Sequence, residues 1–164
     1  MKLAEALIIR ADLQKRVAQL KARLKDSARV QEGDEPAEAV KDLFAELESH
    51  LAELESLIYR INVTNMQTLS EGESLTRMMA RKDVLTTRLS VMREVLAHVT
   101  DSDPRYGRNE IKYVRTVDVA ALRRSTDEYS KQLRELDTKI QSLNWTVELV
   151  EACGGSPTAP FSNA

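Results

Sequence analysis

Five polar side chains stand in or beside helical stripes that otherwise carry apolar residues. Arg10 and Lys82 occupy stripe positions where an apolar residue is expected. Asn65 continues the stripe that leads into "RINVTNMQT", and Asn62 and Asn144 each open an Asn-x-Thr triplet. A stripe position normally faces a partner helix rather than solvent. The five residues therefore predict one polar layer, to which all four helices of a bundle contribute.

Three interpretations of this polar layer remain open. Buried polar residues in a helical bundle set register and partner choice at some cost in stability. Long cationic side chains can instead extend from a stripe to solvent. The third interpretation is a pocket for a small anion or another ligand, built from side chains that point inward. Four carboxylates stand close enough in the sequence to neutralise the two cations: Glu5, Asp12, Asp83 and Glu148.

The sequence does not support catalysis by these residues. It shows no acid–base pair, no activated nucleophile and no spacing typical of a metal site. The single cysteine, Cys153, cannot form an internal disulfide. We therefore expect a protein that is not an enzyme and has no catalytic residue, cofactor or metal.

The composition indicates long helices in a soluble protein. Charged residues make up 30% of the 164 residues and aromatic residues only 4%, a profile typical of helical bundles and coiled coils. The net charge of −2 provides no overall attraction to nucleic acid or acidic membranes. The sequence has no signal-like segment and no apolar run long enough to cross a bilayer, so we expect a cytoplasmic location.

Four stripes of apolar residues at three-four spacing predict four helices, over residues 3–24, 40–68, 75–99 and 119–150. Additional apolar residues lie beside each stripe and suit a bundle better than a two-stranded zipper. The second stripe consists of Val40, Phe44, Leu47, Leu51, Leu54, Ile58 and Ile61. The additional residues are Leu7, Leu43, Leu57, Met79, Val91 and Val95.

Turn-forming residues separate the four helices. Pro36 suits the first turn of the second helix, while Ser74 and Asp118 are candidate N-caps of the third and fourth. Residues 1–152 are expected to form one helical bundle domain, and residues 153–164 a flexible C-terminal tail.

The expected fold is all-α, an antiparallel four-helix bundle or a set of coiled-coil hairpins, because short connections favour antiparallel neighbours. The loops at 28–35 and 101–117 then lie at one end. Their β-like runs "ARVQ" and "IKYVRTV" predict a small two-stranded β-ribbon at that end. The polar layer lies toward the other end, with the fourth helix ending near Ala152.

A basic loop precedes the fourth helix, and two roles are possible for it. Four cations alternate with Tyr106 and Tyr113, so the loop could contact phosphates and stack a base. It could equally balance the acidic segment "QEGDE", and the slightly negative net charge favours this second role. The four cations are Arg105, Arg108, Lys112 and Arg115.

Several segments together resemble a family of short bacterial helical proteins, some of whose members carry the label septicolysin. The segments are "QKRVAQL", "VQEGDEPAE", "RINVTN", "EIKYV…TVDVA" and "LNWT". The resemblance covers nearly the whole chain up to the tail and implies a helical fold. The label implies a secreted toxin that damages membranes, and the resemblance supplies no catalytic residues.

The function expected from these observations is that of a non-enzymatic helical scaffold or protein-interaction module. The wide apolar faces predict self-association into a homo-oligomer, with a further protein partner unknown and no nucleic-acid or membrane partner. Two alternatives are a membrane-active cytolysin and a protein that binds a small anion or ligand at the polar layer.

Overall fold

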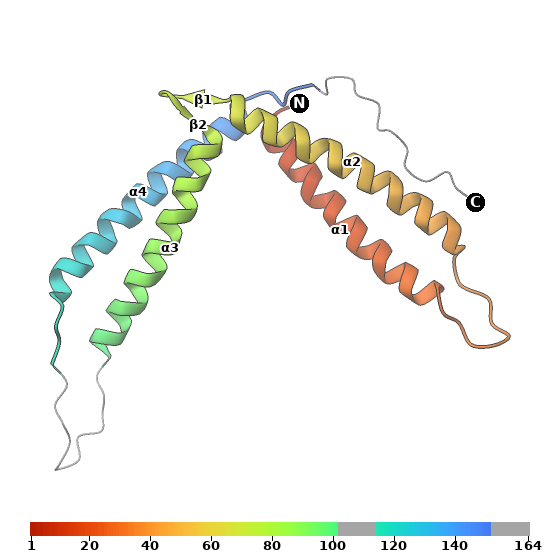
Figure 1. The fold of residues 1–164 in the computed structure, drawn as a ribbon, viewed down its shortest axis with the longest axis horizontal. Coiled ribbons are helices and arrows are strands. Elements are labelled where there is room, and N and C mark those ends of the chain that lie inside the picture. The colour runs from red at the N-terminus through yellow and green to blue at the C-terminus, as the bar shows by residue number, and fades with distance from the viewer. Residues whose placement is uncertain (102–113, 152–164) are drawn as a thin grey trace, which may run out of the picture. The chain divides into compact units, whose positions relative to one another are not determined.

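The computed structural model describes residues 1–101 and 114–151, which form four long helices and one short ribbon. The predicted all-α class, with antiparallel helices and a small β-ribbon, is confirmed (Figure 1). The helices pack in pairs, as a helical bundle requires. In chain order the elements are α1 (Leu3–Ser27), α2 (Val40–Gln67), β1 (Leu69–Ser70), β2 (Glu73–Ser74), α3 (Leu75–Thr100) and α4 (Val119–Thr146).

The chain divides into two compact units. The first comprises Met1–Leu69 together with Asn144–Ala164, and the second comprises Ser70–Leu143. Helices α1 and α2 lie side by side in the first unit, and α3 and α4 in the second (Figure 1). A single domain over 1–152 stays a prediction, and the predicted tail at 153–164 lies outside the described residues.

The core of the first unit lies between α1 and α2. Leu20 and Leu24 of α1 form a buried cluster with Leu43 of α2, and Val40 and Leu47 pack against it. Burying a leucine side chain contributes about 2 kcal/mol. The stripe predicted over residues 3–24 is confirmed, because its leucines are all buried: Leu3, Leu13, Leu20 and Leu24.

The buried face of α2 differs from the predicted stripe. Leu43 and Leu57, expected beside the stripe, are buried, whereas three expected stripe residues are exposed: Phe44 by 52%, Leu51 by 39% and Ile58 by 36%. The apolar sector of α2 is wider than the surface that α1 alone can cover. Helix α1 therefore covers one edge of the sector and leaves the other edge open.

The second unit is held by apolar and polar contacts between α3 and α4. Leu85 and Leu89 of α3 are buried, as are Leu136 and Ile140 of α4. Arg93 Nη2 donates to Ser130 Oγ at 3.3 Å, and the Arg88 guanidinium lies 4.7 Å from the centre of the Tyr129 ring. These buried residues belong to the apolar patterns predicted over residues 75–99 and 119–150.

The β-ribbon joins α2 to α3 rather than lying beside the loop that precedes α4. Its two-residue turn consists of Glu71 (φ 53°) and Gly72 (φ 80°), and positive φ at both positions is what a type I′ hairpin turn requires. Residues 28–31 and 114–116 form no strand, so the predicted place was wrong, and residues 111–113 are not described. Pairing β1 with β2 across a two-residue turn closes a far shorter loop than pairing residues 28–31 with the segment before α4. The loss of chain entropy is therefore smaller.

Two predicted helix caps are confirmed. Ser74 Oγ accepts a hydrogen bond from the backbone N–H of Arg77 at 3.3 Å, and Asp118 Oδ1 accepts one from Ala121 at 3.0 Å. The start of α2 at Val40 agrees with the predicted stripe, but the prediction that Pro36 lies in the first turn was wrong, because Pro36 precedes the helix.

Candidate functional site

Residues near the two chain ends pair at one end of the first unit. The backbone N–H of Leu3 donates to the carbonyl of Val147, and that of Leu149 donates to the carbonyl of Met1, both at 2.9 Å. Lys2 and Glu148 face each other in this antiparallel bridge. Helix α4 therefore ends at Thr146 and not near Ala152, where the sequence predicted its end. Val147 and Leu149 form backbone hydrogen bonds with Leu3 and Met1 instead of continuing the helix.

The C-terminal part of α2 fixes the same segment. The backbone N–H of Val150 donates to Thr64 Oγ1 at 3.1 Å, and the Thr64 hydroxyl donates to the carbonyl of Arg60 at 2.7 Å. Arg60 Nε donates to the carbonyl of Val150 at 2.9 Å. We call this arrangement the terminal clasp: residues 1–3 and 147–150 together with Arg60 and Thr64. The threonine of the first Asn-x-Thr triplet thus has a structural role.

The terminal clasp also contains charged groups that pair with one another. Glu148 accepts from the N-terminal ammonium at 3.1 Å and pairs with Lys2 Nζ at 2.7 Å. Lys2 Nζ also donates to the carbonyl of Thr146 at 3.1 Å. Hydrogen bonding from Lys2, and secondly from the N-terminal ammonium, lowers the pKa of Glu148. The clasp therefore contributes more stability when this carboxyl group is ionised.

Four residues of the predicted polar layer belong to the first unit. Asn65 and Asn144 are buried, each with 8% of its surface exposed, whereas Asn62 is exposed. Arg10 is half-buried, and its buried Nε has no hydrogen-bond partner among the described residues. Register, outward extension and ligand binding therefore remain open for these side chains.

Lys82, the fifth residue of the predicted layer, belongs to the second unit. Its ammonium pairs with Asp137 of α4. Sequence reasoning missed Asp137, although its place between the stripe residues Leu136 and Ile140 was a usable signal. Three of the four expected carboxylates act elsewhere: Glu148 pairs with Lys2, Glu5 accepts from the backbone N–H of Lys2 at 2.7 Å, and Asp12 pairs with Lys15 at 3.5 Å.

The predicted basic loop falls largely outside the described residues. Arg105, Arg108 and Lys112 are not described, whereas Arg115 is exposed in the segment before α4. Its role against the acidic segment or a phosphate stays a prediction.

Exposed apolar side chains form a surface along the length of α2. We define the α2 stripe as Phe44, Leu51 and Ile58, which are spaced seven residues apart and are all exposed. A shallow groove of about 450 Å³ lies along it. The groove is lined by Leu51, Leu54, Glu55, Ile58, Tyr59 and Asn62.

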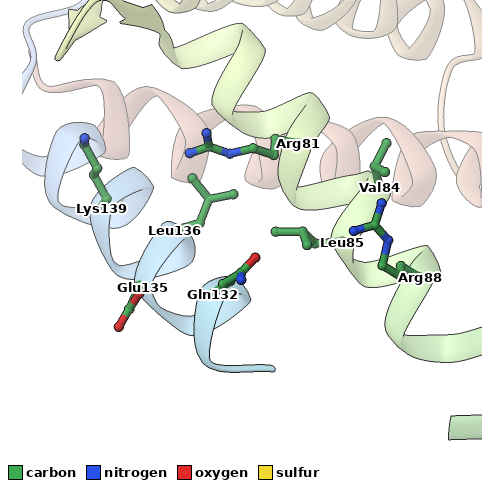
Figure 2. Close-up of a pocket in the computed structure, with 8 residues that line it drawn as sticks. All are labelled: Arg81, Val84, Leu85, Arg88, Gln132, Glu135, Leu136 and Lys139. Carbon is green, nitrogen blue, oxygen red and sulfur yellow. The ribbon is translucent and has the colours of Figure 1, made fainter. Parts of the chain in front are cut away.

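A second groove, of about 520 Å³, runs between α3 and α4 in the second unit. Figure 2 shows Leu85 and Leu136 facing each other from the two helices, with Arg81 and Arg88 on the α3 side. Lys139 lines the α4 side and forms an ion pair with Glu71 at 2.6 Å. The remaining lining residues are Val84, Gln132 and Glu135. The groove therefore combines an apolar floor with cationic edges.

The apolar surface continues along α3 beyond this groove. Val84 and Val91 are exposed by 59% and 55%, and Val95 is also exposed. We define these three residues as the α3 stripe. Val84 and Arg88 line both the α3–α4 groove and a neighbouring one of about 500 Å³ that extends to Val91.

The comparisons with known proteins agree with this helical architecture. The family described as "Family of unknown function (DUF6847)" matches residues 10–149. The chain belongs to this family. A crystal structure of "a functionally unknown conserved protein from Corynebacterium diphtheriae" is 40% identical to this DUF6847 chain, with a TM-score of 0.85. The match covers 92% of this chain and 99% of the other.

The DUF6847 assignment replaces the coarser resemblance found in the sequence. Neither the family description nor the description of the similar structure carries the septicolysin label. No curated protein matches the chain. Within residues 1–101 and 114–151, no helix of this DUF6847 protein is sufficiently long and apolar to cross a membrane.

Proposed function

We propose that this DUF6847 protein is a non-enzymatic scaffold or protein-interaction module that associates with itself through the α2 stripe. The observation that supports this function most directly is the exposure of Phe44, Leu51 and Ile58 at heptad spacing. Such a stripe gains stability when it packs against another helix. Every copy of the chain presents it, and symmetric dimers are the commonest way to cover such a face.

Light scattering on purified protein tests self-association. The wild type is expected to be a dimer, and Leu51→Lys/Ile58→Lys is expected to be monomeric because it places two like charges on the stripe. The matched control is Ser49→Lys/Ser56→Lys, which adds the same charge at the same spacing on other exposed positions of α2. This control is expected to remain dimeric.

Two results would overturn the proposal. One is a wild-type protein that stays monomeric at high concentration. The other is a Leu51→Lys/Ile58→Lys variant that dimerises as well as the Ser49→Lys/Ser56→Lys control. Circular dichroism must show the same helical content in all three proteins, which is expected because every substituted residue is exposed.

The proposal also includes a cytoplasmic location and the absence of catalytic activity.

The two alternative functions predict different measurements. A cytolysin would release dye from liposomes, whereas we expect no release. A protein that binds small anions would show a higher melting temperature in inorganic phosphate than in chloride of equal ionic strength, whereas we expect equal values.

A further inference from the structure

Acidic residues accompany the α2 stripe at a fixed spacing. Glu48 and Glu55 each follow a stripe residue, Phe44 or Leu51, by four positions. The two glutamates are exposed and seven residues apart, which is about 10.5 Å along a helix. The stripe is therefore an apolar seam with a negative edge.

Basic residues accompany the α3 stripe at the same spacing. Arg88 follows Val84 by four positions, and Arg81 precedes Arg88 by seven. Both arginines are exposed and line the α3–α4 groove. Val84 and Val91 therefore form an apolar seam, and Arg81 and Arg88 form a positive edge of the same period, whose next position is Val95.

We propose that the α2 stripe of one copy packs antiparallel against the α3 stripe of a second copy, and that the second copy returns the same contact. This inference rests on the proposed self-association and names the surface that receives the α2 stripe. Glu48, Glu55 and Arg88 each lie four positions after an apolar seam residue, and Arg81 lies one heptad before Arg88. When two heptad helices run antiparallel, equivalent flanking positions lie on the same side of the interface, so Glu48 and Glu55 meet Arg88 and Arg81.

Both arginines are available for this contact. Within the described residues, the Arg88 guanidinium contacts the ring of Tyr129 and no carboxylate. Arg81 pairs with Glu73 at 3.0 Å, but more than half of its side chain is exposed. Ion pairs between exposed side chains contribute little because water screens them, so Arg81 can exchange this partner at an interface.

Charge reversal followed by mixing tests the contact. In Glu48→Arg/Glu55→Arg, both contacts of a homodimer would place Arg against Arg. In Arg81→Glu/Arg88→Glu, both contacts would place Glu against Glu. Each variant alone is expected to self-associate at least about tenfold more weakly than the wild type. Mixed in equal amounts, the two variants form dimers in which both contacts pair opposite charges.

A second pair of variants controls for net charge. Glu53→Arg/Asp127→Arg and Arg124→Glu/Lys131→Glu change the net charge by the same amounts at other exposed positions. Each control is expected to dimerise alone as the wild type does. Light scattering measures the mass of each protein and mixture, and circular dichroism confirms that every variant is folded.

The outcomes separate this inference from the proposed function. Restored dimers in the mixture support the reciprocal contact between copies. If the two charge-reversed variants dimerise alone, the α2–α3 contact is wrong but self-association stands. If both are monomeric and the mixture stays monomeric, the reciprocal contact is also wrong. A monomeric wild type overturns the inference and the proposed function together.

Discussion

The hydroxyl of Thr64 accepts the backbone N–H of Val150 at 3.1 Å and donates to the carbonyl of Arg60 at 2.7 Å. Thr64 is 1% exposed, so no water can replace either partner readily. Through this residue α2 holds the segment that follows α4. The polar end of α2 therefore stabilises the first unit whether or not it binds a ligand.

Thr64→Val is predicted to lower the free energy of unfolding of the first unit by about 1–3 kcal/mol. The substitution keeps the shape but leaves the Val150 N–H without its acceptor. Urea denaturation measures the change. In the control Thr138→Val, an exposed hydroxyl that donates only within α4 is removed, and the loss should stay within about 0.5 kcal/mol. Equal losses for the two variants would contradict a special role for Thr64.

Arg10→Met is predicted to raise the free energy of unfolding by about 1 kcal/mol. The buried Nε of Arg10 has no hydrogen-bond partner among the described residues, and methionine removes this unsatisfied group while keeping an apolar stem. Arg16→Met, at an exposed position of α1, is the control and should change stability little. A large destabilisation by Arg10→Met would show that the cation has a partner in the folded protein.

Gly72→Ala is predicted to destabilise the β-ribbon by about 1 kcal/mol, because φ is +80° at this position. A Cβ atom would meet no other atom there, so the cost comes from backbone strain alone. Gly72→Asn should cost less, since asparagine tolerates the left-handed region better. Thermal denaturation of both variants tests this order, and an alanine variant more stable than the asparagine variant would contradict the strain argument.

The stability of the first unit is predicted to fall at acidic pH through Glu148. Because folding lowers the pKa of Glu148 below its ordinary value of 4.5, its contribution is fully present above 4.5 and disappears as the pH falls through the lowered value. Glu148→Gln should therefore be less stable than the wild type at neutral pH and less sensitive to acid. The control Glu53→Gln should keep the acid sensitivity of the wild type, and urea midpoints across this pH range provide the comparison.

The helices could be predicted from the sequence because their buried residues recur at regular spacing. Leu13, Leu20 and Leu24 of α1 are buried, as the stripe indicated, and so are Leu85 and Leu89 of α3. The N-caps at Ser74 and Asp118 were also predictable, because a short polar side chain before an apolar run satisfies free N–H groups.

The register of α2 could not be predicted, because its apolar residues cover more than one face. Leu43 and Phe44 are adjacent and both apolar, and only the packing of α1 decides that Leu43 is buried and Phe44 exposed. The end of α4 was missed for a similar reason. Val147 and Val150 continue the heptad spacing, but the Val147 carbonyl accepts from the backbone N–H of Leu3 and the Val150 N–H donates to Thr64 Oγ1, so both residues bond outside the helix.

The five-residue polar layer stays a prediction. Burial of Asn65 and Asn144 in the first unit agrees with a polar region there. Lys82 belongs to the second unit and pairs with Asp137, so this ion pair joins α3 to α4. The sequence alone does not show that Lys82 pairs with distant Asp137 rather than with neighbouring Asp83.

The terminal clasp also affects the order in which the protein folds during synthesis. Residues 1–3 leave the ribosome long before their partners at 147–150, because the whole of α1, α2, α3 and α4 lies between them in the chain. The α3–α4 hairpin closes through contacts that are nearer in sequence and can form earlier. Until Val147 and Val150 have emerged, the end of α1 and α2 lacks these hydrogen-bond partners, and a nascent chain halted before Val147 would leave that end exposed.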